Sequence, residues 1–285
     1  MAASFNVDLS GKVAVVTGGG GVLCGRMAEA LAECGAAVAV ADLRRENADA
    51  VAGRIRKNGG TAIGVACNVL DRKSLEKAAK KISKDLGPVD ILINGAGGNH
   101  PQATTSTEYL EPGAIQKKPK GAVTFHDLDP KSIAFVFNLN FLGTLLPSQV
   151  FTRDMTARGS GVVINISSMN AFRPLTKIPA YSAAKAAVSN FTQWLAVHLS
   201  KSGVRVNAIA PGFFLTDQNR SLLTKPDGSL TKRAGTILAH SPLGRFGIPA
   251  DLVGVTLWLA SDDASGFVTG AVIPIDGGFS AFSGV

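Results

Sequence analysis

Cysteine is scarce in this sequence, and its three cysteines, Cys24, Cys34 and Cys67, stand apart from one another. They form no CxxC pair and no cluster with histidine, which are the spacings that zinc sites use. The sequence therefore indicates no metal site and no disulfide framework. Such sparing use of cysteine favours the reducing cytoplasm as the compartment.

Long apolar runs are also missing, although hydrophobic residues make up 46% of the chain. No uninterrupted run reaches the ~18 residues that a membrane-spanning helix needs. Residues 1–8 contain neither the basic nor the apolar region of a signal peptide. No linker rich in proline and serine divides the chain, so we expect a single α/β domain over residues 1–285 and no membrane partner.

Positive charge is in excess, with a formal net charge of +8, but the lysines and arginines are scattered along the chain. A nucleic-acid-binding surface would gather them into stripes with aromatic residues between them. We therefore expect no nucleic acid partner. The excess charge indicates a solvated surface, or an attraction for anionic substrates and cofactor phosphates.

Glycine, in contrast, is abundant, and the four consecutive glycines 18–21 follow a β-branched run at residues 12–17. The apolar periodicity of residues 22–34 predicts a helix directly after them. Strand, glycine turn and helix N-terminus together form the arrangement in which backbone N–H groups bind a pyrophosphate. A glycine turn alone can also be no more than a tight bend.

Asp42 makes the dinucleotide interpretation more specific. It ends the next predicted strand, residues 37–41, near the position where an acidic side chain accepts a hydrogen bond from a ribose 2′-OH. A carboxylate there would repel a 2′-phosphate, which favours NAD over NADP. Arg44 and Arg45 leave NADP open, since either side chain could turn towards a phosphate.

Predicted strands and helices then alternate along the chain. We expect helices at 45–57, 72–85, 131–158 and 249–260, and strands at 62–66, 89–93, 161–166, 205–209 and 271–275. This alternation predicts an α/β fold, a Rossmann-type doubly wound parallel sheet of about seven strands with helices on both faces. Ligands of such sheets bind at the carboxyl ends of the strands. Asn68 stands at one such end, and the segment Asn94-Gly95-Ala96-Gly97, called the box below, stands at the next.

Tyr181 and Lys185 lie four residues apart, so on a helix they share one face. A phenol titrates near ~10, but a neighbouring ammonium favours the phenolate and makes the tyrosine a usable acid or base. Ser168 follows the predicted strand 161–166, and its hydroxyl could bond the substrate oxygen that Tyr181 protonates or deprotonates. A lone tyrosine–lysine pair of this spacing is common on surface helices. The other motifs therefore decide whether this pair is catalytic.

The motifs together resemble those of the short-chain dehydrogenase/reductase family over nearly the whole chain. In the family's order stand the glycine-rich stretch 17–25, the box 94–97, Asn140, Ser168, Tyr181 with Lys185, and Pro211-Gly212 with Thr216. The resemblance implies that Tyr181 is the general acid/base and that Lys185 lowers its pKa and holds the nicotinamide ribose. It also implies that Ser168 polarises the substrate oxygen and that Asn140 fixes a water in the proton relay. The implied cofactor contacts are Gly18, Gly20, Gly21, Leu23, Asp42, Asn68, Val69, Asn94, Ala96, Gly97, Tyr181, Lys185, Pro211, Gly212, Phe214 and Thr216.

The sequence departs from the family's pattern in its glycine turn. Val22 and Cys24 stand where the family has further glycines, so Gly20, Gly21 and Gly25 are expected to form a slightly different turn. The relay asparagine is assigned to Asn140 rather than to Asn138, because residues 140–144 match the family's helix motif.

Two stretches concern the substrate. Residues 98–127 form a long insertion without periodicity, which is either a functional element near the active site or a mobile surface segment. Residues 213–240 resemble the family's substrate lid, which closes over the nicotinamide. The candidate substrate contacts are Asn99, His100, Asn170 and Arg173. Arg173 could clamp a substrate carboxylate in two-point fashion or only cap its loop.

Within the family, the glycine turn, the stretch 94–101, the insertion and residues 140–147 look most like the D-mannonate oxidoreductase (fructuronate reductase) branch. The resemblance implies hydride transfer between a sugar-acid secondary alcohol and a nicotinamide, and a homotetramer or dimer. Gluconate, a polyol or a 3-oxoacyl thioester remain open as substrates, because one fold serves many alcohols. A nucleotide-sensing regulator without turnover is a further alternative, although such proteins usually lack the tyrosine or the lysine.

Overall fold

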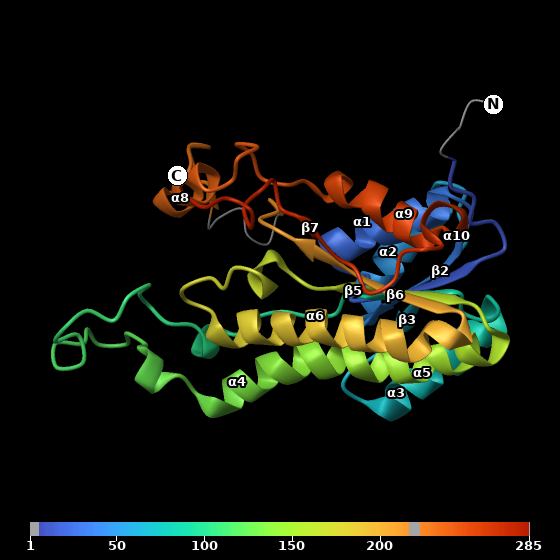
Figure 1. Ribbon diagram of the computed structural model, residues 1–285, viewed down its shortest axis with the longest axis horizontal. Coiled ribbons are helices and arrows are strands. Elements are labelled where there is room, and N and C mark those ends of the chain that lie inside the picture. Colours follow the sequence, from blue (N-terminus) through green and yellow to red (C-terminus); the bar gives the residue numbers. More distant parts are fainter. Residues whose placement is uncertain (1–5, 217–222, 285) are drawn as a thin grey trace.

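The computed structural model describes residues 6–216 and 223–284 of the chain. Its centre is a parallel sheet with the strand order β3-β2-β1-β4-β5-β6-β7 (Figure 1). The strands are β1 (Val13–Thr17), β2 (Ala37–Asp42), β3 (Ala62–Ala66), β4 (Ile91–Asn94), β5 (Gly161–Ile166), β6 (Val204–Pro211) and β7 (Val272–Ile275). The order reverses between β1 and β4, which confirms the predicted doubly wound, Rossmann-type sheet in a single domain.

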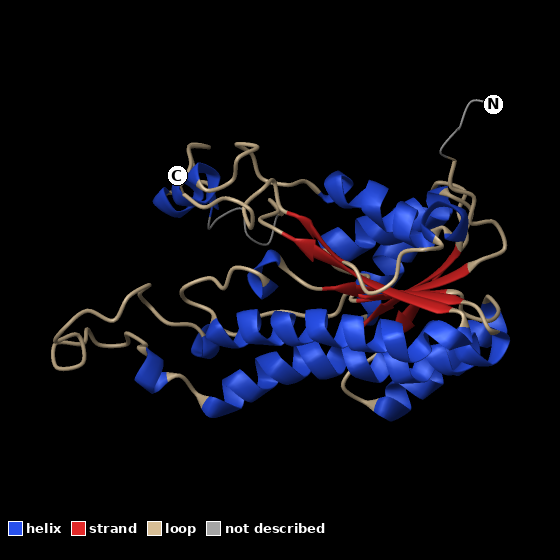
Figure 2. Ribbon diagram, viewed as in Figure 1, coloured by secondary structure: helices blue, strands red, loops and turns tan. Residues whose placement is uncertain are grey.

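Helices cover both faces of the sheet, as predicted (Figure 2). On one face lie α1 (Val22–Glu33), α2 (Arg45–Lys57), α9 (Val253–Ala260) and α10 (Asp262–Ser265). On the other face lie α3 (Arg72–Asp85), α4 (Pro130–Phe137), α5 (Gly143–Arg158) and α6 (Pro179–Leu199). A further helix, α8 (Lys232–Ala239), belongs to the segment beyond the carboxyl end of β6.

The two helical layers explain why the strand sequences do not alternate between apolar and polar residues. Every residue of β1 and of β6 is buried. Side chains on one face of the sheet pack with α1, α2 and α9, and those on the other face with α3, α5 and α6. A strand between two such layers needs apolar side chains on both sides, which gives a continuous apolar run.

The predicted helix over residues 131–158 is interrupted in the structure. α4 and α5 are joined by a π-helical turn, η3 (Asn138–Leu142), which contains the buried Asn140. A π turn adds one residue to the helical repeat and is frequent at functional sites. The side chain of Asn140 is therefore presented from an irregular point of an otherwise continuous helix.

The same helix, taken from residue 130 to 158, is the one segment in the described ranges 6–216 and 223–284 that is long and apolar enough to cross a membrane. Length and composition alone give that result, and core helices of soluble proteins pass the same test. A search for uninterrupted apolar runs misses it because asparagine, serine, threonine and glutamine interrupt the run. In the structure, one side of the helix packs beneath the sheet through Phe151 and Met155.

Two further differences concern the C-terminal third. The predicted helix 249–260 begins as a 3-10 turn, η6 (Pro249–Leu252), before α9, and the short helices α8 and α10 were not expected from the sequence.

The insertion 98–127 contains only two 3-10 turns, η1 (Pro101–Ala103) and η2 (Phe125–Asp127), and otherwise runs as loop away from the sheet (Figure 2).

Candidate active site

The motif residues gather at the carboxyl edge of the sheet because all seven strands run in the same direction. Thr17, Asp42 and Asn94 end β1, β2 and β4, and Ser168 stands two residues beyond the end of β5. Pro211 ends β6. Residues from five separate parts of the sequence therefore meet along one edge, as expected for a sheet of this type.

The glycine turn after β1 brings two backbones into close approach. Gly18 has a φ of +63°, and a Cβ built on it would come within 2.9 Å of the Ala96 backbone in the box after β4. Gly21 caps α1 without any side-chain hydrogen bond, and the first turn of α1 carries no acidic residue. The free N–H groups of this helix start fit an anionic pyrophosphate.

Cys24 occupies space that the turn leaves next to the box. Its sulfur lies 3.9 Å from the Gly95 carbonyl oxygen, and a Cβ on Gly95 would overlap that sulfur. Burial raises the pKa of the Cys24 thiol to about 11, so the group is an uncharged packing element at neutral pH. Cys24 stands where the family has a glycine, and the residue that faces it, Gly95, has no side chain with which it could collide.

Asp42 is held at the end of β2 by two backbone groups. Its Oδ2 accepts from the Gly20 N–H at 3.1 Å and its Oδ1 from the Arg44 N–H at 3.0 Å. The side chains of the neighbouring arginines have partners elsewhere. With the Asn47 carboxamide oriented to accept, Arg44 Nη2 and Nε lie 3.0 and 3.1 Å from its oxygen, and Arg45 forms an ion pair with Asp49.

The remaining cofactor candidates line the same edge. Asn68 is exposed, and its Oδ1 accepts from the Leu70 N–H, while Val69 is buried against Gly143 at the start of α5. The Asn94 amide donates to Ser148 and Asn165, so this side chain joins β4 to α5 and β5. Leu23 lies half-buried in the first turn of α1.

The Asn140 side chain clamps the loop that follows the box. Its Nδ2 donates to the Gly98 oxygen at 2.7 Å, and its Oδ1 accepts from the Gly98 N–H at 3.2 Å. A Cβ on the adjacent Gly97 would come within 2.6 Å of Asn140 Oδ1 and 3.2 Å of Lys185 Nζ. Asn140, Gly97 and Lys185 therefore meet at one point, and only glycine fits between the two side chains.

Ser168 and Tyr181 face each other across the end of β5. Ser168 caps the 3-10 turn η4 (Met169–Ala171), and its hydroxyl lowers the pKa of the Tyr181 phenol. The preceding serine, Ser167, is turned the other way, towards the Lys185 carbonyl and the Ser189 hydroxyl. The structure thus brings together the Ser168 and Tyr181 side chains that the sequence singled out.

Lys185 lies one helical turn from Tyr181, with its ammonium 5.6 Å from the centre of the phenol ring. The ammonium donates to the Ile166 carbonyl at 2.7 Å. Burial lowers the pKa of Lys185 to about 8. Burial also raises the pKa of Tyr181, and the hydrogen bond with Ser168 lowers it. Burial is the larger of these two effects on the Tyr181 pKa, and the lowering expected from Lys185 stays a prediction.

The four candidate substrate residues differ in their surroundings. Asn99 donates to Thr104, and His100 Nδ1 accepts from the Gln102 N–H while the ring packs edge-on against Phe135. Arg173 is exposed, and its Nε donates to the Ser280 carbonyl at 3.1 Å. Asn170 is buried in η4, and its Oδ1 has no hydrogen-bond partner.

The insertion begins beside α6, the helix that carries Tyr181. Ala103 of η1 packs in one apolar cluster with Val136 of α4 and with Tyr181. Further along, the Thr105 N–H donates to the Lys177 carbonyl, and the Lys177 ammonium donates to the Ser106 carbonyl. These two hydrogen bonds join residues 105 and 106 of the insertion to Lys177, which stands in the loop that leads into α6. They therefore fix the first part of the insertion near the start of the helix that carries Tyr181.

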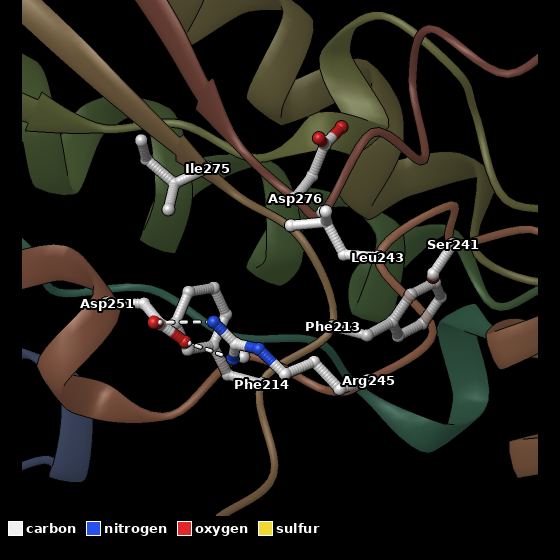
Figure 3. A pocket seen from close by; sticks show the side chains of 10 residues that line it. Phe213, Phe214, Ser241, Leu243, Arg245, Asp251, Ile275 and Asp276 are labelled. Carbon is white, nitrogen blue, oxygen red and sulfur yellow. Dashed lines mark hydrogen bonds and ion pairs between the residues drawn. The ribbon is translucent and has the colours of Figure 1, made fainter.

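The segment after β6 turns away from the sheet over a cavity of about 200 Å³ (Figure 3). Gly212 approaches Asp276 so closely that a Cβ would come within 2.6 Å of its Cα, and Phe214 is buried against Gly247. Arg245 and Asp251 form a two-point ion pair at the rim. Thr216 follows in the described part of the segment 213–240 that is expected to form the lid, and residues 217–222 of that segment lie outside the described residues.

Sequence reasoning missed the C-terminal residues that border the site. Phe279 packs edge-on against Phe213, and Ser280 accepts from Arg173. Asp276 holds this turn by accepting from the N–H groups of Gly278 and Ser280. The only sequence signal was the tight turn Asp276-Gly277-Gly278, which does not indicate the residues it would meet.

The chain is similar to known proteins over nearly its whole length. A family model described as short chain dehydrogenase matches residues 12–227. An uncharacterised oxidoreductase of Bacillus subtilis (strain 168) is 52% identical over 279 residues, which cover 98% of each protein.

Two solved structures are similar over nearly their full length. One, from Haemophilus influenza, is described provisionally as a D-mannonate oxidoreductase and contains bound NAD; it is 52% identical, has a TM-score of 0.93, and the match covers 98% of this chain and 99% of that one. The other is a gluconate 5-dehydrogenase of Burkholderia cenocepacia J2315 in complex with NADP and tartrate, 29% identical with a TM-score of 0.82 over 97% and 98% of the two chains.

Proposed function

The chain belongs to the short-chain dehydrogenase family, and we propose that it is an NAD-dependent oxidoreductase that interconverts a secondary alcohol of a sugar acid and the corresponding ketone. D-mannonate and D-fructuronate are the proposed pair. The observation that carries the reaction type is the place of Tyr181, one helical turn from the buried Lys185, with Ser168 just beyond the end of β5 at the edge of the sheet where the glycine turn lies. The similarity to the NAD-bound Haemophilus structure supports the substrate.

Within this proposal, the chain's own groups divide the work. Tyr181 takes the hydroxyl proton during oxidation of the alcohol and returns it during reduction. The Ser168 hydroxyl donates to the same oxygen and stabilises the charge that develops on it. NAD, when bound, supplies the acceptor for the hydride. Lys185 places a cation one turn from Tyr181, and Asn140 fixes the Gly98 backbone next to it.

The preference for NAD rests on Asp42. Its carboxylate stands at the glycine turn, where it suits a ribose hydroxyl and would repel a 2′-phosphate. Arg44 and Arg45, which could have received such a phosphate, have partners in Asn47 and Asp49. The cofactor contacts implied for Leu23, Asn68, Val69, Pro211, Gly212, Phe214 and Thr216 remain part of this proposal.

The substrate region is proposed to include residues 98–127 and the lid 213–240. The anchoring of Thr105 and Ser106 to Lys177 supports a place for the insertion beside the catalytic helix. Arg173 is exposed and uses only Nε in its bond to Ser280, so its guanidinium is a candidate contact for a sugar-acid carboxylate. Asn99 and His100 are proposed to shape this region from the start of the insertion.

Assembly as a homotetramer, or as a dimer, is also proposed. A row of aromatic rings runs from Phe137 at the end of α4 and Phe141 in η3 to Phe191, Trp194 and His198 of α6. Trp194 and Val197 on this face of α6 are 57% and 77% exposed. Such a face suits a second copy of the chain, and light scattering of the purified protein gives its mass. We place the protein in the cytoplasm, which agrees with three unpaired cysteines.

NADH formation by the purified protein tests the substrate. D-mannonate is compared with D-gluconate and mannitol, each with NAD and NADP in parallel. Saturable turnover of D-mannonate with NAD is the expected result. Turnover of D-gluconate alone would transfer the assignment to the activity that the Burkholderia relative carries. Absence of turnover with all of them would favour a regulator that binds the nucleotide without reaction.

A further inference from the structure

The box 94–97 and the glycine after it are bonded at both ends to the helix that runs from α4 through η3 into α5. Asn94, at the first end, donates from Nδ2 to the Ser148 hydroxyl at 2.9 Å. Gly98, at the other end, donates its N–H to Asn140 Oδ1 and accepts from Asn140 Nδ2. The segment that carries several of the cofactor candidates is therefore clamped at two points by side chains of one helix.

Thr144 stands between these two clamps, four residues after Asn140 and four before Ser148. Residues with this spacing lie on one face of a helix. The Thr144 hydroxyl donates to the Asn140 carbonyl at 2.9 Å, and the Thr144 carbonyl accepts from the Ser148 hydroxyl at 2.8 Å. Because Thr144 is only 1% exposed, water does not compete for these bonds. An unbroken line of hydrogen bonds thus joins the two clamps through Thr144.

The Thr144 hydroxyl acts on an irregular part of the helix. Asn140 lies in the π turn η3, where the Gly143 N–H reaches the Asn138 carbonyl five residues back instead of four. A threonine hydroxyl that bonds the carbonyl four residues earlier bends a helix locally. The bond from Thr144 therefore bears on the direction in which the Asn140 side chain leaves the turn.

The position of the Asn140 side chain matters because of Gly97. This glycine is exposed, and a Cβ on it would come within 2.6 Å of Asn140 Oδ1 and 3.2 Å of Lys185 Nζ. A small displacement of the Asn140 side chain therefore changes the space that is left at Gly97. Since Gly97 and Lys185 are both proposed cofactor contacts, we expect such a displacement to weaken the binding of NAD.

We propose that Thr144 is a positioning residue of the cofactor site. Its hydroxyl fixes the backbone of Asn140, Asn140 fixes Gly98, and the clamped segment presents Gly97 to the cofactor beside Lys185. Thr144 is buried and acts only through Asn140. The inference rests on NAD as the cofactor of the proposed reaction, but not on D-mannonate as the substrate.

Thr144→Val tests the proposal, because valine is similar in shape to threonine and lacks the hydroxyl. Two quantities are measured, and neither needs a substrate. They are the exchange rate of the Gly98 amide hydrogen, which reports on the clamp, and the Kd of NAD from calorimetry. We expect the exchange to accelerate about fivefold or more and the Kd to rise about threefold to tenfold. Thr144→Ser keeps the hydroxyl and should stay close to wild type in both.

Thr256→Val is the matched control. Thr256 is also buried, and its hydroxyl donates to the Leu252 carbonyl four residues earlier at 2.7 Å, but it belongs to α9 on the other face of the sheet. This variant makes the same chemical change and should leave both quantities at their wild-type values. The route through Asn140 has its own test. In Asn140→Ala the clamp is gone, so the further change Thr144→Val should raise the Kd of NAD little.

Two results would overturn the inference. One is an equal effect of Thr144→Val and Thr256→Val on both quantities, which would show that the Thr144 hydroxyl only supports the fold. The other is a full, additive effect of Thr144→Val in the Asn140→Ala background. If Thr144→Val does not fold, Thr144→Ala and Thr144→Ser give the same comparison without and with the hydroxyl.

Failure of the proposed function is distinguishable from failure of this inference. A protein that shows the expected effects of Thr144→Val on Gly98 exchange and on NAD binding, but oxidises none of the sugar acids, would support the inference while the proposed substrate falls. A wild type that binds no NAD would contradict both the proposed reaction and the inference.

Discussion

Lys185 Nζ lies 2.7 Å from the main-chain oxygen of Ile166, the last residue of β5. β5 leads directly to Ser168, and Lys185 shares a helix face with Tyr181. One hydrogen bond thus ties Lys185 of α6 to the strand that leads to Ser168. The relative placement of Ser168 and Tyr181 depends on this contact as well as on the packing of α6 against the sheet.

The buried Lys185 predicts a stability that varies with pH. Burial lowers its pKa from 10.5 to about 8, so between these pH values the unfolded chain binds a proton that the folded chain has released. The free energy of unfolding of wild type therefore rises with pH across this window. Lys185→Met removes the effect, and its stability relative to wild type should fall by about 3 kcal/mol from pH 7 to 10.5. Urea unfolding at several pH values measures this difference, and a constant difference would contradict it.

Tyr181 predicts the pH profile of alcohol oxidation. Burial raises the pKa of the phenol, and the phenolate is the base, so kcat/KM for oxidation should rise with pH on the alkaline side. Ser168→Ala removes the hydrogen bond that lowers this pKa, and the rise should move to higher pH. Ser168→Thr, which keeps the hydroxyl, should return the profile towards wild type. A profile in Ser168→Ala that does not move, or that moves to lower pH, speaks against the assignment.

Asp42 predicts the choice of cofactor. Asp42→Ala removes a charged acceptor for the ribose 2′-OH and the repulsion of a 2′-phosphate, so kcat/KM with NAD should fall by about tenfold to hundredfold. The value with NADP should rise relative to NAD. Asp85→Ala is a matched control, because Asp85 pairs with Lys81 on the exposed surface of α3 and neither residue is a cofactor candidate. If Asp42→Ala keeps the wild-type preference, the contact with the 2′-OH is absent.

Cys24 and Gly95 form a matched pair that predicts coupled stability effects. A Cβ at position 95 would overlap the Cys24 sulfur and would come within 2.8 Å of the Thr17 carbonyl. Gly95→Ala should lower the free energy of unfolding by about 1–3 kcal/mol. Adding Cys24→Ala should recover part of that loss, since only the contact with Thr17 then remains. Strictly additive effects of the two substitutions in a double-mutant cycle would refute the pairing.

Much of the fold could be predicted because the strands are short, apolar and separated by turn signals. The expected bounds at 161–166 agree with β5, and the expected helices 45–57 and 72–85 agree with α2 and α3. The parallel direction of the strands then places Asp42, Asn94 and Ser168 at one edge without further information. This is why the positions of the catalytic candidates followed from the sequence.

The features that escaped prediction depend on contacts between distant residues. The π turn around Asn140 leaves no mark in the local periodicity, and its side chain bonds to Gly98, 42 positions away. Arg173 meets Ser280 across 107 positions. The hydrogen bonding of the candidate substrate residues is equally hard to predict. Whether the side chains of Asn99, His100 and Asn170 have partners within the protein depends on how the insertion and the turn η4 fold.

If Tyr181 transfers the proton of an NAD-linked alcohol oxidation, the reaction depends on its phenol oxygen. NADH formation from D-mannonate and the other sugar acids is measured for wild type and for Tyr181→Phe, with NAD affinity measured in parallel by calorimetry. Tyr181→Phe is expected to lose turnover by about 100-fold or more while it still binds NAD. Near-normal turnover in Tyr181→Phe would contradict the account, because the phenol oxygen would then have no part in the reaction.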